Sequence, residues 1–410
     1  MASSADPSYP DPVRWAVDDR SPTLYTRVYR ALMWARRDKL AFEGADHTLR
    51  VAREQQAKGD APPTRWTRWV RRVEERRTDD LRVWTVAPRR STPVARVVYL
   101  HGGGYVHPLT ADYWRLVRAL TSARAPAPAE VVVPAYPLAP DATIDDVLPQ
   151  LVRLYAEVAG ADPRVPLLLM GDSAGGALVL VVAAALRDAA EDGDATTVPR
   201  APVGLVLLSP WLDGTLDEDE VADLEASDPM LAESGLRAAA SWWAGERGPA
   251  DPLVSPVNGR VLDLPPTDVF TGAHDILRPA IDRLADVARR DGLALHVHEV
   301  PAMFHVWMTR AMPEARRTRN ELAALVASRC APETRPKHPR NPGGAQWDPL
   351  GSAQRGVGGV GRRGRGGARC CGGCGRRWRT ARARWRGWRR AVGTTGPTSW
   401  RCRSSPGWRA

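Results

Sequence analysis

The stretch from Val165 to Gly176, VPLLLMGDSAGG, decides the fold of this chain. Its first half is an apolar run with the length of a buried strand, and its second half is a glycine-rich turn. Residues 177–186 are apolar on all sides, as expected for a buried helix. Residues 171–175 therefore fit Gly-x-Ser-x-Gly between a strand and a helix. This sharp turn exposes the serine hydroxyl at the edge of a sheet, so Ser173 is a candidate nucleophile.

Similar units recur on both sides of this stretch. Further short apolar runs, each followed by a turn or loop signal, occupy residues 94–100, 130–133, 203–208, 268–271 and 293–300. Helical patterns separate them, for example at 144–158 and 279–290, and two more short strands are expected at 69–75 and 81–86. Strands that alternate with helices predict an α/β fold with a mostly parallel central sheet, covered by helices on both faces.

Three segments divide the chain. Residues 1–65 contain a helical pattern from Ser21 onward and no strand pattern, which predicts an N-terminal helical cap segment or a simple appendage. Residues 66–330 form the expected catalytic domain. Within it, residues 212–250 break the strand and helix rhythm, and we expect a cap insertion at the edge where α/β active sites lie. Residues 331–410 lack apolar periodicity and predict a disordered Arg/Gly/Trp-rich tail.

The formal net charge of +11 comes from one end of the chain. Residues 331–410 hold 19 Lys and Arg against 2 Asp and Glu, so residues 1–330 hold 39 against 45, a net charge of −6. A mildly acidic body is not expected to bind nucleic acid. The tail could bind it through charge and stacking. We favour the alternative that the tail is a frameshifted reading, because out-of-frame GC-rich codons give the same residues.

Cysteines and apolar runs limit the class of protein. The first cysteine is Cys330, so the body has no disulfide framework and no thiolate metal site, and the tail cysteines lack a fourth zinc ligand. The N-terminus lacks the pattern of a signal peptide. The longest apolar run, 177–186, is about half the ~20 residues that a membrane span needs. These features predict a cytoplasmic protein without a membrane span, and they leave open whether it forms a homodimer.

A second glycine-rich motif, His101-Gly102-Gly103-Gly104-Tyr105, directly follows an expected strand. Successive glycines expose backbone N–H groups, which together with that of Ala174 can form an oxyanion hole. The alternatives are a flexible turn or a phosphate loop, but no Gly-Lys-Ser/Thr follows. Supporting roles in the two motifs are expected for His101, Gly102, Gly171 and Gly175.

A serine nucleophile needs a base and an acid that orients the base. In folds with this turn the chain order is serine, acid, histidine. Asp275 ends an expected strand after Ser173, and His305 follows the next strand. The rival residues His296, His298, Asp263 and Asp268 come before or within strands, so they fit less well.

Together these motifs resemble the hormone-sensitive-lipase-like family of carboxylesterases, which have the α/β-hydrolase fold. The matching segments are 101–104, 136 with 138–140, 171–176, 228–229, 251–256, Asp275 and His305. The resemblance implies a central eight-stranded sheet, a helical cap, and oxyanion donors at Gly103, Gly104 and Ala174. Two departures stand out: Pro137 replaces an arginine of the family pattern, and Val306-Trp307 replaces the usual Gly-Phe after the histidine.

The sequence therefore predicts a serine carboxylesterase that hydrolyses short-to-medium acyl esters of small molecules through an acyl-enzyme intermediate. It would require no metal and no organic cofactor. Tyr105, Trp242 and Trp243 are expected to line the substrate pocket. Two alternatives stay open: an N-acetyl amide hydrolase with the same three residues, and a non-catalytic ligand receptor on the same fold.

Overall fold

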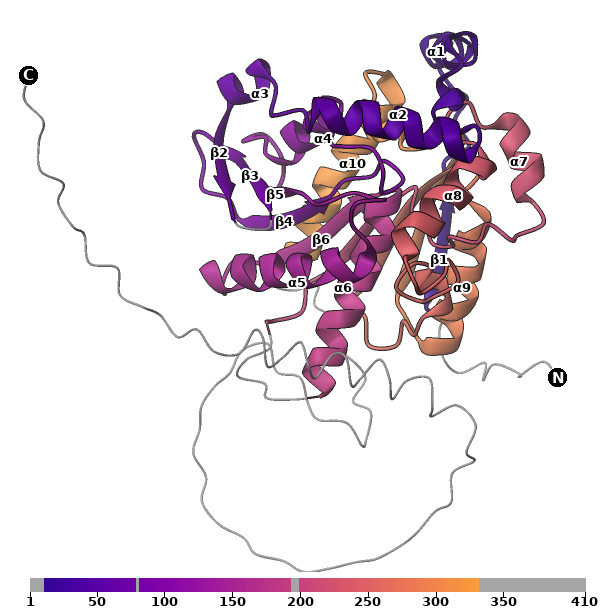
Figure 1. Ribbon diagram of the computed structural model, residues 1–410. Helices are drawn as coiled ribbons and strands as arrows, with labels where there is room; N and C mark the ends of the chain where they lie inside the picture. The colour runs from indigo at the N-terminus through magenta and orange to yellow at the C-terminus, as the bar shows by residue number, and fades with distance from the viewer. Residues whose placement is uncertain (1–10, 79–80, 193–198, 332–410) are drawn as a thin grey trace, which may run out of the picture. The chain divides into compact units, whose positions relative to one another are not determined.

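The computed structural model describes residues 11–78, 81–192 and 199–331 (Figure 1). The expected tail lies outside these residues from position 332 onward. The described strands form one sheet with the order β1-β9-β8-β7-β6-β4-β5-β3-β2. They are β1 (Val13–Val17), β2 (Arg71–Arg77), β3 (Arg82–Pro88), β4 (Ala95–Leu100), β5 (Ala129–Ala135), β6 (Leu167–Asp172), β7 (Leu205–Leu208), β8 (Thr267–His274) and β9 (Leu295–Phe304).

The central strands of this sheet are parallel, as predicted from their continuous apolar runs. Antiparallel pairing is confined to β3, which lies between β2 and β5 at one edge. The strand expected at 69–75 begins later than predicted. Residues up to Val70 belong to a short helix whose first turn is capped by the Thr64 hydroxyl, which accepts from Thr67 N, so the strand starts at Arg71.

The opposite edge of the sheet corrects two expectations. Strand β1 pairs in parallel with β9, with Val13 opposite Leu295, so the sheet has nine described strands rather than eight. Residues 1–65 are consequently not helical throughout. The periodicity of β1 was hard to detect because only Val13 is buried in this five-residue edge strand. A hydrogen bond from the Trp15 indole N–H to Glu299 (2.7 Å) stabilises the pairing.

Helices cover both faces of the sheet (Figure 1). Helices α4 and α10 pack together on one face, and α5, α6 and α9 lie on the other. The helices are α1 (Leu24–Arg36), α2 (Ala45–Lys58), α3 (Arg65–Val70), α4 (Tyr113–Leu120), α5 (Ile144–Ala161), α6 (Ala174–Glu191), α7 (Val221–Ser227), α8 (Glu233–Ala244), α9 (Pro279–Asp291) and α10 (Pro313–Cys330), with 3-10 turns η1 (Asp38–Phe42), η2 (Pro256–Asn258) and η3 (Trp307–Thr309). Helix α6 is buried on nearly all sides, as its sequence predicts.

Helix α8, from the 212–250 segment, packs against η1 and α2 from the N-terminal segment. Gly235 allows this close approach. A Cβ atom at Gly235 would lie 2.1 Å from the Phe42 carbonyl oxygen and 2.4 Å from the Thr48 hydroxyl. The two segments expected to form a cap therefore contact each other, and any larger side chain at position 235 would separate them.

Candidate active site

Ser173 lies at the turn between β6 and α6, with φ 51° and ψ −123°. This left-handed conformation is costly for a residue with a side chain, and neighbouring backbone holds it in place. Ser173 N donates to the Leu208 carbonyl, and Trp211 N donates to the Ser173 carbonyl, both at 2.9 Å. A Cβ atom at Gly175 would lie 2.1 Å from the Leu100 carbonyl, so the turn can form only with glycine there.

The expected base and acid contact each other. Nδ1 of His305 lies 2.9 Å from Oδ2 of Asp275, and both side chains are buried, as is Ser173. Burial alone would lower the pKa of His305, but the negative charges of Asp275, Asp228 and Asp172 outweigh it and raise the pKa above its ordinary value. The Nδ1 contact leaves Nε2 as the ring nitrogen without a hydrogen-bond partner among the described residues.

A second buried carboxylate, Asp228, supports this pair, and the sequence assigned it no role. Its Oδ1 accepts from Met230 N (2.7 Å) and Leu231 N (3.0 Å), and its Oδ2 accepts from Ile276 N (3.0 Å). Asp228 therefore ties the cap insertion to the loop that carries Asp275. Burial and the charge of Asp275 raise the pKa of Asp228 to about 6. The sequence signal for this residue was the match of Asp228-Pro229 to the family pattern.

The glycine-rich loop after β4 is fixed by Asp172, the neighbour of the candidate nucleophile. Oδ1 of Asp172 accepts from Gly102 N (2.9 Å) and from the Tyr99 hydroxyl (2.6 Å). Burial raises the pKa of this carboxyl to about 6. His101 also holds the loop, because its Nδ1 lies 2.7 Å from the Gly102 carbonyl and its ring stacks on Tyr136 at 4.4 Å.

The backbone N–H groups of Gly103, Gly104 and Ala174 have no hydrogen-bond acceptor among the described residues. Gly104 and Ala174 are buried and Gly103 is partly buried. Buried N–H groups are rarely left unpaired, so these three can donate to a negatively charged oxygen. Ala174 is also the first residue of α6, where the helix dipole favours a negative charge.

The N-terminal segment contacts this loop directly. Gly104 has φ 61°, and a Cβ atom there would lie 2.9 Å from the Phe42 ring of η1. Gln56 of α2 donates from Nε2 to the carbonyls of Val106 and Ala139, both at 2.8 Å. The N-terminal segment thus fixes the end of the glycine-rich loop through one apolar and one polar contact.

Three aromatic rings stack beside the loop. Tyr105 is buried, and its ring lies parallel to Trp243 of α8, with centroids 4.4 Å apart and an interplanar angle of 1°. Tyr105 also stacks on Trp211, at 5.4 Å and 27°. Trp242 is only half-buried, and among the described side chains it makes no ring contact with Tyr105. Of the two tryptophans expected near the pocket, Trp243 is therefore the one that contacts the loop.

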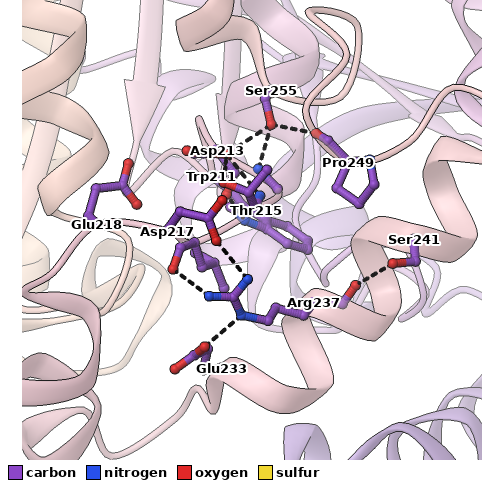
Figure 2. Close-up of polar contacts among 12 residues, drawn as sticks. Trp211, Asp213, Thr215, Asp217, Glu218, Glu233, Arg237, Ser241, Pro249 and Ser255 are labelled. Atoms are coloured by element: carbon purple, nitrogen blue, oxygen red, sulfur yellow. Dashed lines mark hydrogen bonds and ion pairs between the residues drawn. The ribbon is translucent and has the colours of Figure 1, made fainter.

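Polar contacts hold the 212–250 segment where it leaves the sheet (Figure 2). The Trp211 indole N–H donates to the Asp213 carbonyl at 2.8 Å, and the Ser255 hydroxyl lies 3.1 Å from the Asp213 carboxylate. Arg237 of α8 pairs with Asp217 (2.9 Å) and Glu233 (2.6 Å). These contacts fix the positions from which Trp211 and Trp243 reach Tyr105.

Comparison with known proteins agrees with this arrangement. A family model described as the alpha/beta hydrolase fold matches residues 97–309, which is more than half of the chain. The chain belongs to the α/β-hydrolase family. The fold predicted from its sequence is therefore confirmed.

Several relatives of this α/β-hydrolase have names that describe an activity. An acetyl-hydrolase of Streptomyces hygroscopicus is 31% identical over 225 residues, which cover 54% of this chain and 71% of the relative. An esterase of Acinetobacter venetianus is 26% identical over 241 residues, which cover 57% and 74%. A solved esterase of the bacterial hormone-sensitive lipase family has a TM-score of 0.64 at 22% identity, over 76% of this chain and 100% of the other. These names agree with the expected esterase-like, lipase-like hydrolase.

The rival residues of the hydrolase lie at the other end of the strands. Asp268, near the start of β8, lies opposite His296 of β9 and pairs with Arg329 at 2.6 Å. Burial would raise the pKa of Asp268, but hydrogen bonds from His296 and His298 and the charge of Arg329 hold it well below its usual range. This cluster joins β8, β9 and α10. It lies near the start of β8, whereas Asp275 follows the end of that strand.

The described residues contain no group of three or more His, Cys, Asp or Glu side chains that could hold a metal ion. None of their helices combines the length and the apolar character that crossing a membrane requires.

Proposed function

We propose that the protein is a serine carboxylesterase in which Ser173, His305 and Asp275 act as nucleophile, base and orienting acid. One observation carries the proposal: the buried His305–Asp275 pair, 2.9 Å apart, occurs in the same fold as a serine in a strained turn. The unpaired N–H groups of Gly103, Gly104 and Ala174 support it further, because acyl transfer creates an oxyanion that needs such donors.

The reaction begins when His305 Nε2 takes the proton of the Ser173 hydroxyl and Oγ attacks the ester carbonyl carbon. The carbonyl oxygen becomes an oxyanion that accepts from the three N–H groups, and removal of one such donor typically costs about 3–4 kcal/mol. The tetrahedral intermediate collapses, the carbon–oxygen bond breaks, and His305 protonates the leaving alcohol. Water deprotonated by His305 then attacks the acyl-enzyme and releases the acid.

Asp275 keeps His305 in the productive tautomer, because its carboxylate accepts from Nδ1–H. Asp172 holds the glycine-rich loop in register with Ser173 through Gly102 N. Both carboxylates also favour the imidazolium that forms during the attack, since they raise the pKa of His305 against the effect of burial.

The alternatives have less support. An N-acetyl amide hydrolase would use the same three residues, but the comparisons do not favour it. A non-catalytic receptor would need neither a buried histidine–aspartate pair nor a serine in a strained turn, since strain and burial of this kind are costly.

We also propose that the preferred acyl groups are short to medium in length. The support is the stack of Tyr105 and Trp243, which is fully buried beside the glycine-rich loop. Rigid rings in that place would stop an extended acyl chain, because overpacking costs more than further burial gains.

Hydrolysis of p-nitrophenyl butyrate by purified full-length protein tests the proposal. Ser173→Ala should abolish turnover without changing the melting temperature appreciably. The matched control is Ser241→Ala, at an exposed position on α8, which should behave as wild type. Turnover that survives in Ser173→Ala would refute the assignment, and an inactive but folded wild type would favour the receptor alternative.

A further inference from the structure

The edge of the sheet formed by α3, β2 and the end of β3 has an unusual surface. Trp66 and Trp69 of α3 are 57% and 68% exposed, and their ring centroids are 4.8 Å apart. Two large indole rings side by side in water are costly to leave uncovered, so an exposed pair of this kind indicates a contact surface. Figure 1 shows α3 and β2 at one side of the sheet, and β1 forms its opposite edge.

The same edge is strongly basic. Residues 65–90 contain nine arginines and four Asp and Glu, a net charge of +5, whereas residues 1–330 as a whole total −6. The rest of the body therefore carries −11. This separation of charge favours an orientation in which the α3 edge faces an anionic surface.

Most of this positive charge is not neutralised. Arg68 and Arg72 have only loose carboxylate partners: Glu75 lies 3.7 Å from Arg68, and Glu74 and Glu130 lie 3.5 and 3.9 Å from Arg72. Arg65 and Arg90 are exposed and have no hydrogen-bond or ion-pair partner within the described part of the chain.

The arginines also line two shallow, open hollows at the surface. One, of about 340 Å³, is lined by Arg68, Arg71, Arg72, Val73 and Arg89. The other, of about 490 Å³, is lined by residues 88–93 and Arg72. Arg89 lines both hollows, and its side chain is held in place because it donates to the carbonyls of Arg68 (2.7 Å) and Arg71 (3.1 Å). Arginine side chains that line a hollow suit the oxygens of a phosphate group.

We propose that this α3 edge, made of residues 65–72 and 88–93, docks on an anionic phospholipid surface. The hollows take lipid phosphates while Trp66 and Trp69 lie at the level of the headgroups, where indole rings are favoured. The combination of exposed tryptophans with arginines favours a lipid surface, because docking on an anionic surface uses both apolar insertion and charge. The proposal goes beyond the proposed ester hydrolysis and uses none of the residues assigned to it.

The test must report on these two tryptophans, since the full chain has 16. We would label the full-length protein with 5-fluorotryptophan and assign the fluorine resonances by Trp66→Phe and Trp69→Phe. Vesicles would contain phosphatidylcholine alone or with phosphatidylglycerol, together with a nitroxide-labelled lipid that broadens nearby resonances. Trp84, which is fully buried, and Trp34, which is 43% exposed on α1, serve as internal controls.

We expect the Trp66 and Trp69 resonances to broaden with phosphatidylglycerol, and not with phosphatidylcholine alone or in high salt. Arg72→Gln/Arg90→Gln should weaken the effect severalfold, whereas the Trp84 resonance should not change. Sharp Trp66 and Trp69 resonances in anionic vesicles, with or without broadening of Trp34, would overturn the proposal. So would a response to a short DNA duplex in the absence of any response to vesicles, because it would indicate a nucleic-acid surface. Neither outcome depends on esterase activity.

Discussion

The ring of Trp243 in α8 lies parallel to that of Tyr105, the residue that follows Gly104, with centroids 4.4 Å apart. Tyr105 has φ 62° and is buried, and Trp211 packs on the same ring. The shape of the cap and the position of the loop are therefore coupled through three aromatic rings, and changes in the cap should alter the acceptance of acyl chains.

Trp243→Ala tests this coupling. The substitution removes a fully buried ring beside the loop, so we expect the optimum in a series of p-nitrophenyl esters to move to longer acyl chains. The loss of a buried tryptophan should also destabilise the fold by about 3–5 kcal/mol. Trp242→Ala, on the same helix but half-buried, is the matched control and should leave the chain-length optimum in place. A palmitoyl optimum in the wild type, unchanged by Trp243→Ala, would be incompatible with this role.

Asp228→Asn should change the pH dependence of the reaction. The raised pKa of His305 depends partly on the charge of Asp228, so loss of that charge should lower the pKa of the base. Since the base must be neutral to act, the acidic limb of the kcat/KM profile should shift to lower pH. Because the pKa of Asp228 is itself about 6, its charge acts on His305 only above that pH.

The pH profile separates this effect from a purely structural one. If Asp228 only held the Ile276 backbone, Asp228→Asn would lower kcat at all pH values and leave the acidic limb where it is. Asp282→Asn on α9, an exposed carboxylate paired with Arg278, is the control for a general change in surface charge. It should leave the profile unchanged.

Asp275→Asn should reduce kcat by on the order of 10⁴-fold while the protein stays folded. The amide can donate to Nδ1 of His305 and thereby favour the wrong tautomer, in which Nε2 carries the proton. Single-turnover kinetics with p-nitrophenyl acetate would measure the loss. Asp268→Asn, in the cluster at the far end of β8, should instead lower stability and leave kcat within severalfold of wild type. Equal losses of kcat in the two variants would contradict the assignment of Asp275.

The features that could be predicted from the sequence depend on residues that are close together in the chain. The turn at Ser173 and the loop at Gly103 and Gly104 need glycine or strained backbone within a few residues, and such needs are visible in sequence. The contact of Asp228 with Ile276 and that of Gln56 with Val106 were missed because each joins a side chain to a backbone group about fifty residues away. No periodicity records contacts of that kind. Strand β1 was missed because an edge strand buries too few residues to show a pattern.

Val306 offers a test of strain beside the candidate base. It directly follows His305 with φ 49° and ψ 39°, a left-handed conformation that is unfavourable for a β-branched residue and natural for glycine. Its N–H donates to the Ser209 hydroxyl at 3.1 Å, which holds the backbone in this state. We therefore expect Val306→Gly to be more stable than Val306→Ala by about 1 kcal/mol, because alanine keeps a Cβ atom that opposes this conformation. Both variants lose the same valine packing, so the comparison isolates the effect of the backbone conformation.

At exposed Ala324 in α10 the order of stability should reverse, and Ala324→Gly should cost about 1 kcal/mol in urea unfolding. If Val306→Ala proved as stable as Val306→Gly, the left-handed backbone after His305 would have to be abandoned.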